Sequence, residues 1–266
     1  VGLGSTEVLY SNGLVSLTNN GTISGGYAGF QGNIGTFVNN GTVSGLYSFI
    51  NNGAMTSFIN NVSMSGTYLG VINMSSSVIS SFSNSGTISG GYGGITNTGT
   101  IMSLINTGTI SGGIWNDPES SIPVIGSLHN LQGASGALSY YMKLPANYNI
   151  IIADSTNFGK LAVSIAMGTT TFGISSLSTT STSILNTPLN SVLTGVAAAN
   201  LVNTSGTSNG YTFVLTQTTP TSGIWNLLIT AYSGGGSSGS SANGSTVSTI
   251  SSGTSVGLVS LGASPV

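Results

Sequence analysis

The chain has 266 residues, of which 39% are hydrophobic and only 2% are charged, and its formal net charge is -2. Lysine and arginine together number 2, so no basic cluster exists that could neutralise the phosphates of a nucleic acid. The absence of cysteine excludes disulfides and thiol chemistry, and no apolar run reaches the roughly 18 residues of a membrane helix. Disordered chains are usually rich in charge and poor in β-branched residues, so this composition indicates a folded chain.

Residues 1–16 are predicted to form a first strand or a cap, because Val8, Leu9 and Tyr10 make a β-forming run. A repeat of the form Asn-x-Gly-Thr-Ile/Val-Ser-Gly then dominates residues 17–115. Its leading asparagines stand at positions 19, 39, 60, 84 and 106, so the copies are 20, 21, 24 and 22 residues apart. Short β-branched runs between turns at such a period predict an all-β fold, a parallel β-helix with coils of about 20–24 residues.

The asparagines and glycines of the repeat are expected to form the corners between strands, since both residue types tolerate positive φ. Stacked coils would place each asparagine over the next, where side-chain amides can hydrogen-bond along the stack. The predicted stacking corners are Asn19, Asn39, Asn60, Asn84 and Asn106.

The period breaks after residue 115. Asp117-Pro118-Glu119 and Pro123 predict a transition loop over residues 116–136. Longer strands are expected in a C-terminal β-solenoid region over 137–232, with an ambiguous stretch around 175–203. A Gly/Ser-rich linker at 233–245 then leads to a strand-forming tail at 246–266.

Candidate catalytic and metal-binding residues are few. Asp117 and Glu119 would lie about 6.6 Å apart on a strand, a separation compatible with inverting glycoside hydrolysis or a weak calcium site. Pro118 and the lack of a third ionisable neighbour favour a solvated loop instead. His129 has no evident partners for a metal site or for activating a serine, and is expected in a loop or interface. We therefore expect no enzyme activity, no metal and no cofactor.

Two further groups of residues have structural interpretations. Lys143, Asp154 and Lys160 lie in one sequence neighbourhood and are expected to form an ion pair. Aromatic residues recur through the repeats and are expected in the core or in stacks between coils rather than as a platform for sugars. These aromatics are Tyr27, Phe30, Tyr47, Phe49, Tyr68 and Tyr92.

The repeats resemble those of autotransporter passenger domains, the secreted β-helical parts of type V secretion proteins of Gram-negative bacteria. Ordered segments at 148–163, 210–215 and 224–229 resemble strands that follow such repeats, so the likeness covers residues 17–232. The resemblance implies a right-handed β-helix, export through an outer-membrane barrel and an extracellular location. Because the chain starts at Val1 without a signal peptide, a mature fragment is expected.

Two functions follow from this interpretation. The first is a structural protein that assembles with itself head to tail, with residues 246–266 or 1–10 adding a strand to a neighbouring copy. The second is an adhesin-like module that binds a glycan or a cell surface, and a solenoid like a phage tail spike is a third alternative. Neither nucleic acid nor membrane insertion is expected.

Overall fold

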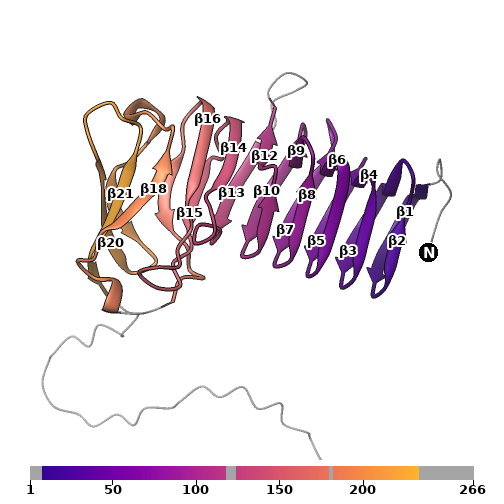
Figure 1. The fold of residues 1–266 in the computed structure, drawn as a ribbon, viewed down its shortest axis with the longest axis horizontal. Coiled ribbons are helices and arrows are strands. Elements are labelled where there is room, and N and C mark those ends of the chain that lie inside the picture. The colour runs from indigo at the N-terminus through magenta and orange to yellow at the C-terminus, as the bar shows by residue number, and fades with distance from the viewer. Residues whose placement is uncertain (1–7, 118–123, 180–181, 234–266) are drawn as a thin grey trace, which may run out of the picture. The chain divides into compact units, whose positions relative to one another are not determined.

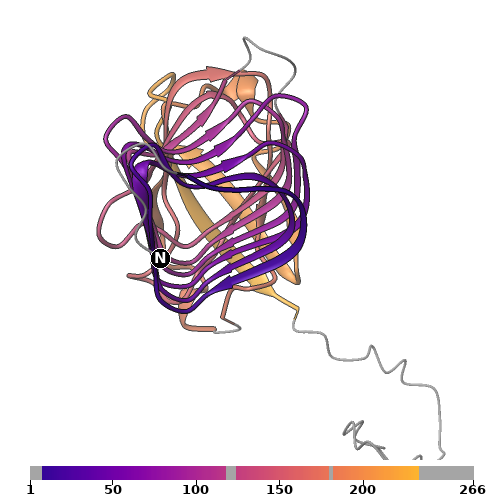
Figure 2. The ribbon, with the colours of Figure 1, turned by 90° about the vertical axis from the view of Figure 1, so that its right-hand side faces the viewer.

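The computed structural model describes residues 8–117, 124–179 and 182–233 (Figure 1). These residues form a β-solenoid of about 7 turns, with 65% of residues in strands and 2% in helices. Successive coils lie one above the next, and their outlines coincide when viewed along the stack (Figure 2). The predicted fold class, a stack of mostly parallel β-coils, is confirmed.

Three parallel sheets run along the stack, and long strands bend through a corner to serve two of them. Sheet A contains the last residues of β1 (Val8–Asn19) and β3 (Ala28–Asn39), and then β5 (Ala54–Asn60), β7 (Val78–Asn84), β10 (Thr100–Asn106), β13 (Val124–Asn130), β15 (Asn147–Ile150) and β17 (Thr171–Ile174). Sheet B contains β2 (Thr22–Ser24), the first residues of β4 (Thr42–Asn51) and β6 (Ser63–Asn73), and then β8 (Thr87–Gly90) and β11 (Thr109–Ser111). Sheet C contains the first residues of β1 and β3, the last of β4 and β6, and then β9 (Gly93–Asn97), β12 (Ile114–Asn116), β14 (Leu138–Lys143), β16 (Leu161–Met167) and β18 (Leu189–Thr194).

The core lies inside the coils, because alternate residues of each strand point inward. In sheet A, Phe37, Phe58 and Phe82 occupy one register position of successive coils, and all three are fully buried. The rings of Phe58 and Phe82 stack with their centroids 4.3 Å apart. Repetition of one apolar residue per coil thus produces a continuous column of buried rings.

The parallel coils end before residue 232, so the region 137–232 is not a solenoid throughout. After β18 the chain forms an antiparallel sheet in the order β18, β21 (Trp225–Tyr232), β20 (Tyr211–Gln217) and β19 (Ser205–Ser208). Its buried Phe213, Leu227 and Ile229 belong to the same hydrophobic core as the coils. An antiparallel layer therefore covers the last coil.

Two further expectations for the second half differ from the structure. Strands after residue 137 are not longer, since β1 and β3 have 12 residues each and β21, the longest of the later ones, has 8. Strands of the repeats run through corners without interruption, which lengthens them. The expected loop 116–136 also contains β13, which pairs in register with β10 and carries His129 within a strand.

Glycines at the corners have a different role from the one expected. Gly21, Gly41, Gly86 and Gly108 are not among the residues with positive φ. A Cβ added to Gly41 would lie 2.0 Å from the carbonyl oxygen of Gly21, and one on Gly108 would lie 2.1 Å from that of Gly86. Gly41, Gly86 and Gly108 are needed because the preceding coil approaches too closely for any side chain, whereas a Cβ at Gly21, in the first coil, would meet no atom within 4 Å.

Candidate functional site

Asparagines form columns at two of the three corners of the stack. At the corner between sheets A and B, the structure places the five predicted residues at equivalent positions, with Asn130 continuing the column after Asn106. A second column lies at the corner between sheets C and A and was not among the predicted site residues, although asparagines at half-coil spacing signal it in the sequence. It consists of Asn51, Asn73, Asn97 and Asn116.

Hydrogen bonds within both columns all point the same way. Each Asn donates from Nδ2 to Oδ1 of the Asn one coil later, as from Asn19 to Asn39 at 2.8 Å and from Asn39 to Asn60 at 2.8 Å. The Oδ1 of an interior member such as Asn39 also accepts the backbone N–H of Gly41, at 3.2 Å. The columns are therefore polar: each has an acceptor end, at Asn19 in the first coil and at Asn51 within the stack, and a donor end at its last member.

The donor ends are occupied. In the first column, Asn130 Nδ2 donates to the carbonyl oxygens of Gln132 and Lys160, at 3.0 and 3.2 Å. In the second, Asn116 Nδ2 donates to the carbonyl oxygen of Lys143, at 2.7 Å. Backbone groups and not further asparagines thus terminate both columns.

Side chains also close the last strands of sheets A and B in this direction, whereas β18 of sheet C pairs with β21. Gln132 bonds to both the N–H and the C=O of Ile110 in β11, the last strand of sheet B. Asn203 does the same for Phe172 in β17, and Ser208 for Ile174. We call this part of the solenoid the closed end, because a strand that approached it would find these backbone groups already paired.

The opposite face of the stack, formed by β1 and β2, is different and is called the open end. These strands pair with β3 and β4 on one side, and among the described residues no strand pairs with their other side. Leu14 and Val15 of β1 are 39% and 83% exposed. Asn19 Oδ1 accepts only the N–H of Gly21 among the described residues, so it lacks the second donor that interior members have. Backbone, apolar side chains and one amide acceptor are thus all available at this edge.

Aromatic residues divide between the core and the surface. Phe30 and Phe49 are fully buried, and their rings stack with centroids 4.9 Å apart. The tyrosines lie instead at the third corner, between sheets B and C, and contact one another from coil to coil on the outside. This column contains Tyr27, Tyr47, Tyr68 and Tyr92.

The charged candidates have ordinary structural surroundings. Asp154 Oδ1 accepts three hydrogen bonds from Thr156 and Asn157, which lower the pKa of its carboxyl, the bonds from Thr156 contributing most. Lys160 Nζ lies 5.0 Å from the ring centroid of Phe158, so these two side chains have partners other than the expected ion pair.

The other sequence candidates are His129 and the pair Asp117 and Glu119. His129 Nδ1 lies 2.8 Å from Ser175 Oγ, and burial lowers the pKa of the imidazole. Asp117 follows β12, whereas Glu119 and residues 246–266 lie outside the described residues. In the part of the chain that the structure describes, no three His, Asp or Glu side chains gather as metal ligands would, and no helix is long and apolar enough to cross a bilayer.

Comparisons with known proteins give no assignment. No protein-family model, no curated protein and no solved structure matches this chain. The asparagine columns and the two ends of the stack are therefore the observations on which a function can be proposed.

Proposed function

We propose that this chain is a non-enzymatic structural protein whose copies assemble head to tail through strand addition at the open end. The observation that supports it is the polarity of the first asparagine column. Its donor end at Asn130 is filled, whereas its acceptor end at Asn19 lacks a donor among the described residues. A strand with an asparagine at the matching position would extend the column in the same direction.

The polarity also argues against assembly of two open ends face to face. That arrangement would bring Asn19 Oδ1 toward its counterpart, and two acceptors without a hydrogen cannot bond. The closed end offers no free strand in the coils that the structure describes, since Gln132, Asn203 and Ser208 occupy its edge groups. β19, the outer strand of the antiparallel sheet, pairs only with β20 among the described residues, but it contains no asparagine that could extend the column. We therefore propose that the added strand comes from elsewhere in the neighbouring copy.

The C-terminal tail contains a sequence of the required kind. Asn243-Gly244-Ser245-Thr246-Val247-Ser248 has the same pattern as Asn60-Asn61-Val62-Ser63-Met64-Ser65, with Asn first, Ser or Thr fourth, an apolar residue fifth and Ser sixth. In the solenoid, the last three of these positions form a strand of sheet B and the asparagine joins the first column. We propose that residues 243–248 of one copy pair with β2 of the next, with Asn243 Nδ2 donating to Asn19 Oδ1. Parallel backbone pairing and burial of Val247 would stabilise the contact.

Composition supports a structural role outside the cell. A surface with 2% charged residues carries few of the lysines that normally discourage edge pairing. The Asn-x-Gly-Thr-Ile-Ser-Gly repeats on a β-solenoid support the finer proposal that the chain is an autotransporter-type passenger segment at the surface of a Gram-negative bacterium. Its few, separated ionisable groups support the proposal that it is not an enzyme.

Electron microscopy and light scattering of the full chain test the proposal. We expect filaments whose mass rises with protein concentration. Deletion of residues 243–266 should abolish them, whereas deletion of residues 252–266, which keeps the repeat-like segment, should leave them. A full chain that stays monomeric at high concentration, or filaments that survive the longer deletion, would refute assembly through this segment.

A pair of lysine substitutions tests the other side of the contact. Val15 and Met102 occupy the same register position of sheet A, with Val15 in β1 at the open end and Met102 within the stack. Both side chains are exposed, by 83% and 55%. Val15→Lys should block assembly by placing a charge beside the open edge, and Met102→Lys should not. Equal effects of the two substitutions would contradict a contact at the open end.

A further inference from the structure

The outer surface of sheet C carries a line of aromatic side chains, which we call the aromatic strip. It begins with the tyrosine column, whose ring centroids are 5.1, 5.9 and 4.5 Å apart from one coil to the next. It continues with Trp115 and Tyr141, whose rings stack at 4.3 Å with an interplanar angle of 16°. The strip consists of Tyr27, Tyr47, Tyr68, Tyr92, Trp115 and Tyr141.

The strip lies over a small apolar cluster that is separate from the core. Ala28, Ile50 and Ile72 are buried on the outside of the sheet, and Tyr47 and Leu69 pack against them. Packing against Ile50 and Ile72 holds Tyr47, and its ring contacts those of Tyr27 and Tyr68, so this part of the strip is formed without a ligand. Tyr68 and Tyr92 still leave 41% and 68% of their surfaces exposed. A preformed surface with exposed aromatic rings is typical of a binding site.

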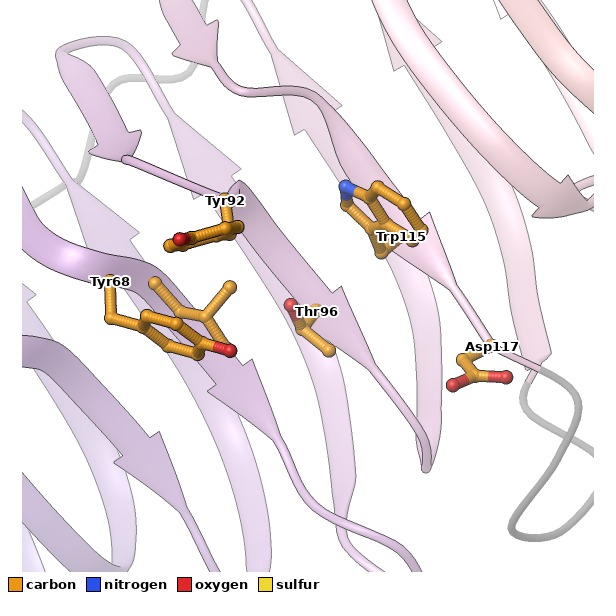
Figure 3. Close-up of a pocket in the computed structure, with 6 residues that line it drawn as sticks. Tyr68, Tyr92, Thr96, Trp115 and Asp117 are labelled. Carbon is orange, nitrogen blue, oxygen red and sulfur yellow. The ribbon is translucent and has the colours of Figure 1, made fainter.

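Two hollows follow the strip and share Leu69 in their walls. One, of about 290 Å³, lies between Tyr27, Tyr47, Met74 and the polar side chains of Gln31 and Asn52. The other, of about 230 Å³, is lined by Tyr68, Leu69, Tyr92, Thr96, Trp115 and Asp117. Figure 3 shows Thr96 on the strand between the tyrosines and Trp115, with Asp117 beyond the end of the next strand. The strip therefore borders two adjoining hollows, both lined by aromatic and polar side chains.

The chemistry of the lining restricts the ligand. Among the described residues, neither hollow is lined by Lys, Arg or His, and the carboxylate of Asp117 repels anions, which disfavours phosphorylated or acidic ligands. Amides of Gln31 and Asn52 and the hydroxyl of Thr96 can donate and accept hydrogen bonds, which suits a ligand rich in hydroxyl groups. Flat tyrosine rings present apolar faces together with phenolic hydroxyls. Sugar rings match this combination, because they have apolar C–H faces and polar edges.

We infer that the aromatic strip binds a linear, uncharged glycan that runs along the stack and contacts one tyrosine per coil. The repetition supports a chain-like ligand: successive coils each place a tyrosine ring beside the previous one, with centroids 4.5–5.9 Å apart. The main competing occupant is a second copy of this chain that packs sideways against the strip. An apolar peptide is less suitable, because polar side chains line both hollows. This inference concerns sheet C and is independent of assembly at the open end.

Titration calorimetry with cellohexaose and chitohexaose, and with hexagalacturonate as an acidic probe, tests the inference. At least one neutral hexasaccharide should bind, and hexagalacturonate should not. Replacement of two anchors, Tyr68→Ala with Tyr92→Ala, should weaken binding by about tenfold or more, as removal of central aromatic contacts does in other interfaces. Met102→Ala, which removes an exposed apolar side chain from sheet A, is the matched control and should bind as the unchanged protein does.

The outcomes separate the glycan site from self-assembly. The Tyr68/Tyr92 variant should still form filaments, and Val15→Lys should still bind the glycan. Failure of both neutral probes to bind, stronger binding of the acidic probe, or unchanged affinity of the Tyr68/Tyr92 variant would overturn the inference. Loss of filaments in that variant would show that the strip is a contact between copies instead.

Discussion

Asn84 donates a hydrogen bond from Nδ2 to Oδ1 of Asn106, 2.8 Å away and one coil further along the stack. Both side chains are fully buried. Asn84 Oδ1 accepts the corresponding bond from Asn60, also at 2.8 Å, so one amide joins three coils. Buried amides that satisfy each other in this way fix the register of the coils, because a slip by one residue would leave every member unpaired.

Asn84→Ala is expected to destabilise the protein by about 2–4 kcal/mol, since each buried polar partner left unpaired costs about 1–3 kcal/mol. Chemical denaturation monitored by circular dichroism measures the loss. Asn61 is the control, because it makes a similar bond to Asn40 at 2.7 Å in an exposed position. Asn61→Ala should cost less than about 0.5 kcal/mol. Equal losses would mean that burial of the column contributes nothing.

The column of buried phenylalanines predicts a different kind of sensitivity. Phe58→Ala removes a fully buried ring between Phe37 and Phe82 and should lower the free energy of unfolding by about 3–5 kcal/mol. Met102→Ala, at a side chain that is 55% exposed, should change it by less than about 0.5 kcal/mol. Denaturation midpoints of the two variants provide the comparison. A small effect of Phe58→Ala would indicate that the coils do not enclose a common core.

His129 predicts how stability depends on pH. Burial lowers the pKa of its imidazole from 6.5, so the folded state binds a proton less readily than the unfolded state. Both states are neutral well above pH 6.5, and protonation of the unfolded state reduces stability as the pH falls through that value. Melting temperatures should therefore be lower at pH 5 than at pH 8. His129→Gln should remove most of this difference, because no other side chain of the chain normally titrates in that range. A pH dependence that persists in His129→Gln would contradict this assignment.

The repeating part of the fold can be predicted from the sequence more readily than the antiparallel sheet at its end. The spacing of Asn19, Asn39 and Asn60 reflects the coil directly, because one corner recurs once per turn. The antiparallel sheet that covers the last coil does not repeat, and strands such as β20 and β21 have the same alternation in either pairing direction. Individual strands could therefore be predicted there, but their arrangement could not.

The candidate sites also differ in how far the sequence predicts them. Asparagine corners are visible as a motif, whereas the open end depends on which strand edges remain unpaired in three dimensions. The aromatic strip was also hidden, since Tyr47 and Phe49 are two residues apart and would share one face of a regular strand. In the structure Phe49 lies in the core, whereas Tyr47 packs on the separate outer cluster. Corner glycines were correctly placed at turns, yet the close approach of Gly41 to Gly21 could not be read from the sequence.

Gly21→Ala tests strand addition at the open end most directly. A Cβ at Gly21 would meet no atom within 4 Å, whereas the equivalent atom at Gly41 would lie 2.0 Å from the carbonyl oxygen of the preceding corner. Gly21→Ala should therefore fold with the stability of the unchanged protein, and Gly41→Ala should be markedly destabilised. If residues 243–248 of a neighbouring copy occupy the position before Gly21, their backbone would clash with the new methyl group. Electron microscopy should then show folded Gly21→Ala protein without filaments, and filaments of unchanged length from that variant would contradict the proposed contact.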